Sequence, residues 1–134
     1  GMANYIEIDR RILAGWIAHA NNDNNKAIAL MQSAAELEDK IEKHPVTPGA
    51  LLPANEALGN LLLDLDRPAE ALEAYKASDE IWPGRYNSLL GAARAADQAG
   101  DKLAVEKYYQ RLLTTAGNSE RSDIKKAKSL AGEK

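Results

Sequence analysis

Apolar residues recur along most of this chain at the three- and four-residue spacings that place side chains on one face of a helix. Leu58, Leu61, Leu62 and Leu65 form a clear run, because they fall at positions i, i+3, i+4 and i+7. Phe is absent, while Ala, Leu, Glu and Lys, which favour helices, are abundant. The pattern predicts seven helices, near residues 3–20, 25–43, 53–65, 68–82, 85–99, 102–115 and 119–131.

Short polar breaks separate most of the predicted helices. Residues 21–25 are all Asn or Asp, so they end one helix and offer an N-cap for the next. Pro68 suits the first turn of a helix, and Gly100-Asp101 combines a helix stop with a further N-cap. Residues 44–51 form a longer connection, and because its two prolines cannot continue a helix, we expect a surface loop there.

The predicted helices form pairs that repeat in one register. Gly59 follows Gly15 by 44 residues, and Ala93 follows Gly59 by 34. The same two spacings relate two further sets of residues: Ala27, Ala71 and Val105, and Met31, Tyr75 and Tyr109. We expect the two tyrosines in the core. A helix–turn–helix unit with a 34-residue period is typical of a tetratricopeptide array.

The chain resembles the tetratricopeptide-repeat family, and its second helix pair carries the resemblance best. Positions typical of the family are occupied there by Leu58-Gly59, Ala71, Tyr75 and Pro83. The family's first Trp and its mid-helix Tyr are replaced by Asn55 and Leu62. The third pair keeps Ala93, Val105 and Tyr109 at family positions. The first pair matches less well and has Arg11 at the Trp position.

The resemblance extends over residues 8–117 and implies an all-α fold. Helix pairs of the family stack into a right-handed α-solenoid, so we expect three pairs in a single domain 1–134: about 8–41, 52–85 and 86–119. The helix predicted at 119–131 would cap the last pair. A narrower likeness, carried by loop 44–51 and the RPAEAL stretch 67–72, is to the C-terminal part of long uncharacterised bacterial tetratricopeptide proteins. We therefore expect the chain to be the end of something larger.

Composition and charge narrow the functions that such a scaffold can have. Seventeen Lys and Arg against twenty Asp and Glu give a net charge of −3, which argues against a dedicated nucleic-acid binder. The absence of Cys excludes disulfides, thiolate nucleophiles and Cys-ligated metals. No apolar run approaches the ~18 residues of a membrane helix, and the charged segment 2–20 is unlike a secretory signal peptide. We expect no membrane partner, and a cytoplasmic location unless the chain was cut from an exported protein.

No pattern in the sequence assembles a catalytic, cofactor or metal site. His19 and Asp23 stand one helical turn apart, but a metal site needs three or four ligands, and the spacing supplies no third one. The turn 21–25 fails as a calcium loop, because the twelfth residue from its start is Gln32. The alternating charges of residues 36–43 are interpreted as a solvated helix face. We therefore predict a protein that is not an enzyme and has no cofactor.

The first helices of the three pairs offer candidate partner-binding residues. The repeat spacings place them in two rows: Trp16, Asn60 and Arg94, and beside them His19, Leu63 and Asp97. Ile12, Glu56 and Leu90 form a third row. In the resembling family such rows line a concave groove that holds a partner peptide. The carboxylate clamp of chaperone-binding members is not expected, because these rows contain no Lys and a single Arg.

Two functions remain open from the sequence. The leading hypothesis is a non-catalytic protein-interaction module that binds a peptide or helix of a partner protein in the groove. The alternative is a structural segment that packs on the rest of a longer tetratricopeptide protein or on a second copy of the chain, without a separate ligand. Trp16 would then lie in a subunit contact. A large exposed apolar patch at the N-terminal end would favour this alternative.

Overall fold

The computed structural model describes residues 2–41 and 52–116, and in this part of the chain it is entirely helical, without a strand. The helices are α1 (Met2–Ala20), α2 (Asn24–Ile41), α3 (Ala54–Asp64), α4 (Pro68–Ile81), α5 (Tyr86–Ala99) and α6 (Lys102–Ala116). Each begins and ends within two residues of its predicted bounds, so the all-α prediction is confirmed. The predicted loop 44–51 and the predicted helix 119–131 lie outside the described residues.

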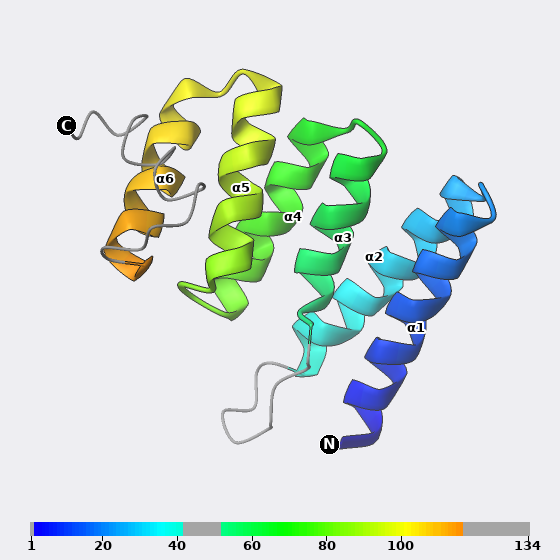
Figure 1. Cartoon of the computed structure of the whole chain (residues 1–134). Coiled ribbons are helices and arrows are strands. Elements are labelled where there is room, and N and C mark those ends of the chain that lie inside the picture. Colours follow the sequence, from blue (N-terminus) through cyan, green and yellow to red (C-terminus); the bar gives the residue numbers. More distant parts are fainter. Residues whose placement is uncertain (1, 42–51, 117–134) are drawn as a thin grey trace.

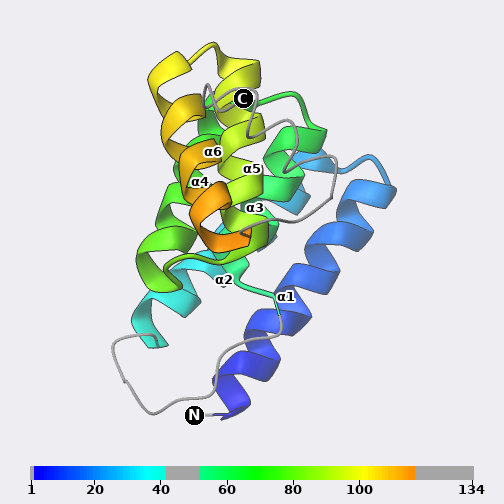
Figure 2. The ribbon, with the colours of Figure 1, turned by 60° about the vertical axis from the view of Figure 1, so that its left-hand side comes forward.

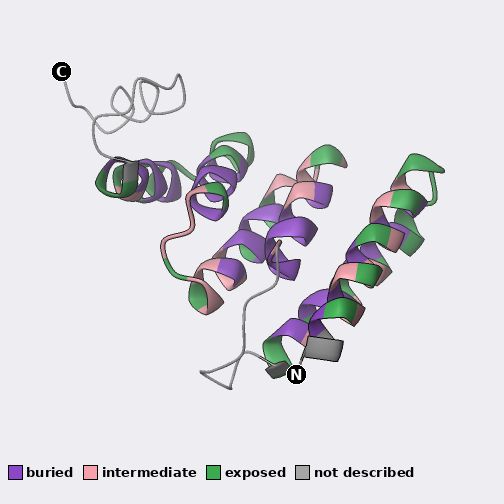
Figure 3. Ribbon diagram, turned by 60° about the horizontal axis from the view of Figure 1, so that its bottom comes forward, coloured by how far each residue is buried: buried purple, intermediate pink, exposed green. Residues whose placement is uncertain are grey.

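The helices follow one another in space in the order of the chain (Figure 1). Each packs against the next one, and both α1 and α5 also contact α3. In Figure 2, seen from a second direction, α6 lies in front of the middle helices and α1 stands apart on the right. Buried positions concentrate where neighbouring helices face each other, and exposed positions lie on the outer sides (Figure 3).

The turn inside each helix pair has the same backbone structure. Its left-handed residue is Asn22, Asp66 or Gly100, with φ of 62°, 58° and 78°. The next N–H donates to the carbonyl oxygen five residues back, over 2.9 Å in all three turns. This is the Schellman ending of a helix, which satisfies carbonyl groups of its last turn. The three turns are 44 and 34 residues apart, as the repeat predicts.

An N-cap side chain or a proline lies at the beginning of the second helix of each pair. The Asp23 carboxylate accepts the N–H of Lys26 at 3.3 Å, and the Asp101 carboxylate accepts the N–H of Ala104 at 3.1 Å. In the middle pair α4 instead begins with Pro68, which has no N–H to satisfy. The caps and the proline start predicted from the sequence are therefore confirmed.

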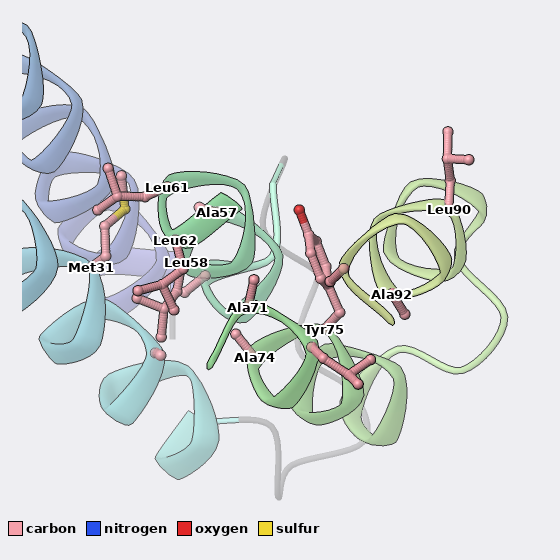
Figure 4. Packing of buried hydrophobic residues seen from close by; sticks show 14 of the residues in the cluster. Met31, Ala57, Leu58, Leu61, Leu62, Ala71, Ala74, Tyr75, Leu90 and Ala92 are labelled. Carbon is pink, nitrogen blue, oxygen red and sulfur yellow. The ribbon is translucent and has the colours of Figure 1, made fainter. Parts of the chain in front are cut away.

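Within a pair, a glycine of the first helix lets a large side chain of the second come close. A Cβ added to Gly15 would lie 3.0 Å from Met31 Cε, and one added to Gly59 would lie 2.8 Å from the Tyr75 ring. Tyr75 and Tyr109 are 1% exposed, so their predicted core positions are confirmed, and Met31 at the equivalent position is fully buried as well. Figure 4 shows Met31 and Tyr75 among the aliphatic side chains around α3. Burial of each such side chain contributes roughly 1.5–3 kcal/mol.

The joint between the first two pairs contains a charged residue that the sequence assigns to a solvated face. Glu38 of α2 is fully buried, so that assignment is wrong at this position. Its carboxylate accepts the N–H of Ala54 at 2.7 Å and the side-chain amide of Asn55 at 3.3 Å. Glu38 thus satisfies donors at the beginning of α3, where a negative charge also suits the helix dipole. Burial raises the pKa of Glu38, and the hydrogen bonds oppose this shift.

Candidate functional site

A cleft of about 370 Å³ lies between α3 and α5, with Tyr75 of α4 in its wall. Helix α3 lines it with Glu56, Asn60, Leu63 and Asp64, and α5 lines it with Asn87, Leu90, Gly91 and Arg94. Each set follows helical spacing, so each helix turns one face to the cleft. The two helices run in the same direction (Figure 1). Glu56 and Asn87 therefore mark one end of the cleft, and Asp64 and Arg94 mark the other.

Half of the predicted partner-binding residues line this cleft, namely Asn60, Leu63 and Arg94. Asn60 and Leu63 are half-buried, and Arg94 is exposed. Glu56 and Leu90 of the third predicted row line it as well, although both are buried. Residues that the repeat spacing puts in neighbouring rows of α3 and α5 are thus brought to one site.

Tyr75 connects the core to the cleft. Its ring fills the space left by Gly59 of α3 and Gly91 of α5, where an added Cβ would lie 2.8 Å and 2.3 Å from ring atoms. Its hydroxyl donates to Asn60 Oδ1 at 2.5 Å. Burial, with the charges of Glu56 and Asp64, raises the pKa of Tyr75 well above its usual range, so the hydroxyl stays a donor. The Asn60 side chain is then held through its amide oxygen.

A buried carboxylate holds the other end of the cleft in place. Glu56 is 1% exposed and accepts hydrogen bonds from Nε and Nη2 of Arg85, both at 3.2 Å. It also accepts the Ser88 hydroxyl at 2.6 Å, and Ser88 shares a 2.9 Å hydrogen bond with Ser78 of α4. The network ties α3, α4 and α5 together. Its charge is paired, which a buried carboxylate requires.

Trp16 and His19 of α1 do not line the cleft, but they continue from its Asp64 end. His19 Nε2 lies 3.9 Å from Asp64 Oδ2, an ion pair when the imidazole is protonated. Its Nδ1 shares a 3.1 Å hydrogen bond with Asn24. The Trp16 ring packs edge-on against the His19 ring, with centroids 5.9 Å apart, and is partly buried against the core. His19 therefore connects α1 to the Asp64 end of the cleft.

Asp97 is the predicted residue that the structure sets apart. It is exposed and lines a separate hollow of about 300 Å³ with Lys102, Val105 and Glu106. It lies one helical turn beyond Arg94 on α5, past the end of the cleft.

The rows predicted from the sequence leave out Arg85, which holds Glu56, and five residues that line the cleft: Leu52, Asp64, Tyr75, Asn87 and Gly91. Tyr75 is predicted only as core, because nothing in the repeat indicates that its hydroxyl emerges next to Asn60. Asn87 could have been found, since it stands three residues before Leu90 on the same helix face. Arg85 has no such signal, because its partner Glu56 is 29 residues away in the sequence.

The cleft combines amides, a phenol, opposite charges and leucines. Such a lining can hydrogen-bond a polar backbone and cover an apolar side chain. No group of three or more His, Cys, Asp and Glu that could hold a metal ion occurs among residues 2–41 and 52–116. No helix in these same ranges is both long enough and apolar enough to cross a bilayer.

No protein-family model matches the sequence, and no curated protein is similar to it.

Proposed function

We propose that this chain is a non-catalytic protein-interaction module of the tetratricopeptide kind, which binds a segment of a partner protein in the cleft between α3 and α5. The observation that carries the proposal is the lining of this cleft by Asn60, Leu63 and Arg94, three residues that the repeat assigns to the partner-binding rows. The net charge of −3 argues against a nucleic acid as the partner, because nucleic-acid binders usually carry an excess of basic residues.

A right-handed α-solenoid is the arrangement that best accounts for the repeat. Three identical turns and three sets of equivalent buried residues recur at spacings of 44 and 34 residues. The contacts of α3 with both α1 and α5 support a stack in which the first helices form one continuous surface. Partner binding on such scaffolds uses that surface, which is where the cleft lies.

The chemistry of the cleft favours an extended peptide. The amides of Asn60 and Asn87 can pair with a peptide backbone, while Leu63 and Leu90 can cover an apolar side chain. A volume of about 370 Å³ is at the small end of ligand sites, which suits a few residues of a chain rather than a whole helix. Exposed Arg94 supplies one positive charge for an acidic residue of the ligand.

Selection from random peptides displayed on phage tests this function. We expect selected peptides to bind the whole chain, and Asn60→Ala and Arg94→Ala each to weaken binding about tenfold or more. Gln32→Ala, which changes an exposed amide on α2, is the matched control and should leave binding unchanged. A selection that yields no binder, or binders that are indifferent to both cleft substitutions, would refute the proposal.

A further inference from the structure

The two carboxylates that line the cleft among the described residues differ in their surroundings. Glu56 is buried, and Arg85 donates two hydrogen bonds to it. Asp64 is the last residue of α3, and its side chain is 59% exposed. In the described part of the chain, His19 has the one basic side chain that comes within 4.0 Å of it. Asp64 therefore keeps acceptor capacity that a ligand in the cleft can use.

The hydrogen bond between His19 and Asn24 decides what the imidazole can offer to Asp64. Asn24 Oδ1 lies 3.1 Å from Nδ1 and is an acceptor, so Nδ1 carries the proton of the neutral ring. Nε2 then has a lone pair and cannot donate to the carboxylate 3.9 Å away. Protonation puts an N–H on Nε2 and a positive charge beside Asp64. His19 therefore neutralises Asp64 only in its protonated form.

The charged groups on the helices packed against α1 single out Asp64 as the partner of His19. Helices α2 and α3 are the ones that pack there. At the beginning of α2, the Asp23 carboxylate accepts the backbone N–H of Lys26, and both residues line a separate hollow beside α1. The charged residues of α3 are Glu56 and Asp64, and Glu56 lies at the far end of the cleft. Asp64 is therefore the cleft residue that protonation of the imidazole affects.

Arg94 lines the same cleft from α5, but at a different level along it. Its equivalent on α3 is Asn60, which precedes Asp64 by four residues. Four residues of helix rise about 6 Å, which is close to the length of two residues of an extended peptide. Side chains two residues apart in an extended chain point to the same side. One peptide can therefore meet Arg94 with an acidic residue and Asp64 with a basic residue two positions away.

We propose that Asp64 binds a lysine or arginine of the partner segment and that protonated His19 competes for the same carboxylate. This inference rests on the proposed function, because it specifies the peptide that the cleft takes. Asp64 ends α3, where the partial negative charge of a helix end also attracts a cation. Histidine changes its charge between about pH 5 and 8, so binding of the basic residue weakens as pH falls through this range.

Selection from random peptides displayed on phage, carried out at about pH 7.5, tests the class of ligand. We expect the binders to carry Lys or Arg two positions from Asp or Glu. Binders that are weakened by Asn60→Ala and Arg94→Ala but lack the basic residue would overturn this inference and leave the proposed function intact. A selection without binders would refute the proposed function and this inference with it.

A synthetic peptide from this selection tests Asp64, with affinities measured by fluorescence anisotropy. Asp64→Asn removes the charge and should raise the dissociation constant about three- to fivefold, as expected for an exposed ion pair. Asp66→Asn is the matched control, because it removes an exposed carboxylate two residues further on that does not line the cleft. It should change the dissociation constant less than about twofold. A peptide with norleucine in place of its basic residue should bind Asp64→Asn and the wild type alike.

The same measurement at about pH 5.5 tests the competition by His19. The wild type should bind the peptide about threefold more weakly than at neutral pH. His19→Asn keeps an N–H donor for Asn24 but carries no charge at either pH, so its affinity should change little. Circular dichroism checks that every variant keeps its helices. Wild-type affinity in Asp64→Asn at neutral pH, or the same change with pH in His19→Asn as in the wild type, would overturn the proposal.

Discussion

Gly91 of α5 lies so close to Tyr75 of α4 that a Cβ added to the glycine would stand 2.3 Å from the tyrosine Cε1. Gly59 of α3 borders the same ring edge, where an added Cβ would lie 2.8 Å away. The hydroxyl of this ring reaches Asn60 in the cleft. The packing between the second and third helix pairs is therefore coupled to the candidate site through one side chain.

This contact makes Gly91→Ala destabilising. Alanine favours a helix interior over glycine by about 1 kcal/mol, but its methyl group would overlap a buried ring, and such overpacking costs about 1–3 kcal/mol or more. We expect a net loss of up to about 2 kcal/mol in the free energy of unfolding, measured by urea denaturation. Gln98→Ala on the exposed side of the same helix should stay within about 0.5 kcal/mol of the wild type. A gain in stability for Gly91→Ala would contradict the contact.

The third pair provides an independent test of the repeat. Tyr109, 1% exposed, is the equivalent of Tyr75 and Met31. Tyr109→Ala removes a buried aromatic ring and leaves a cavity, so we expect a loss of about 3–5 kcal/mol in unfolding free energy. Tyr109→Phe keeps the ring and should cost no more than about 1.5 kcal/mol. A loss below roughly 1 kcal/mol for Tyr109→Ala would mean that the register of the third pair is wrong.

Local chemistry explains why the helix ends could be predicted. Asp23, Pro68 and Gly100 act on the backbone within a few residues of themselves, so their effect can be derived from the sequence alone. The repeat adds the core positions, because residues at equivalent positions of the helix pairs are expected to be buried to a similar degree. Tyr75 and Tyr109 were predicted from that register and are buried.

The contacts between one helix pair and the next could not be predicted from the sequence. Gly91 stands outside the repeated glycine positions, and its role depends on a ring from the preceding pair. Glu38 sits among alternating charges that are typical of a solvated face, yet the beginning of α3 covers it. In the candidate site, the rows of α3 and α5 were predictable, while the Glu56–Arg85 pairing joins residues 29 apart and has no sequence signal.

The buried Glu38 carboxyl predicts a pH dependence. Burial raises its pKa in the folded state, so its stabilising contribution is full below the unfolded value of about 4.3 and declines as pH rises through the folded pKa. Compared with Glu38→Gln, the wild type should therefore lose stability as pH rises above about 4. Urea denaturation of both proteins at several pH values measures the difference between their unfolding free energies. Groups that titrate equally in the two proteins do not contribute to this difference.

Glu7 serves as a control, because its pH dependence of stability should run in the opposite direction to that of Glu38. Hydrogen bonds from Arg10 and Arg11 lower its pKa to about 2, so its contribution is present above about pH 4 and is lost as pH falls towards 2. Compared with Glu7→Gln, the wild type should thus gain stability as pH rises from about 2 to 5. If the Glu38 difference also rose with pH, the raised pKa of Glu38 would be wrong.

The last prediction concerns the network that holds the cleft. Removing the guanidinium in Arg85→Ala leaves the Glu56 carboxylate buried with fewer donors, which should cost about 1–3 kcal/mol of unfolding free energy. A double-mutant cycle with Glu56→Gln should give a coupling of about 0.5–3 kcal/mol, because each residue depends on the other. Arg67, just before α4, and Glu70 in its first turn form an exposed ion pair. The cycle of Arg67→Ala with Glu70→Gln should give a coupling of no more than about 0.5 kcal/mol.

The same network links stability to binding. Glu56 of α3 lines the cleft, and Arg85 is the N-cap residue of α5. Loss of their contact should therefore let α3 and α5 separate at this end of the cleft. We expect Arg85→Ala to weaken the selected peptides although Arg85 does not line the cleft, and Arg67→Ala to leave them unaffected. Additive single effects in the cycle, together with wild-type peptide affinity in Arg85→Ala, would show that the pair neither stabilises the fold nor shapes the cleft.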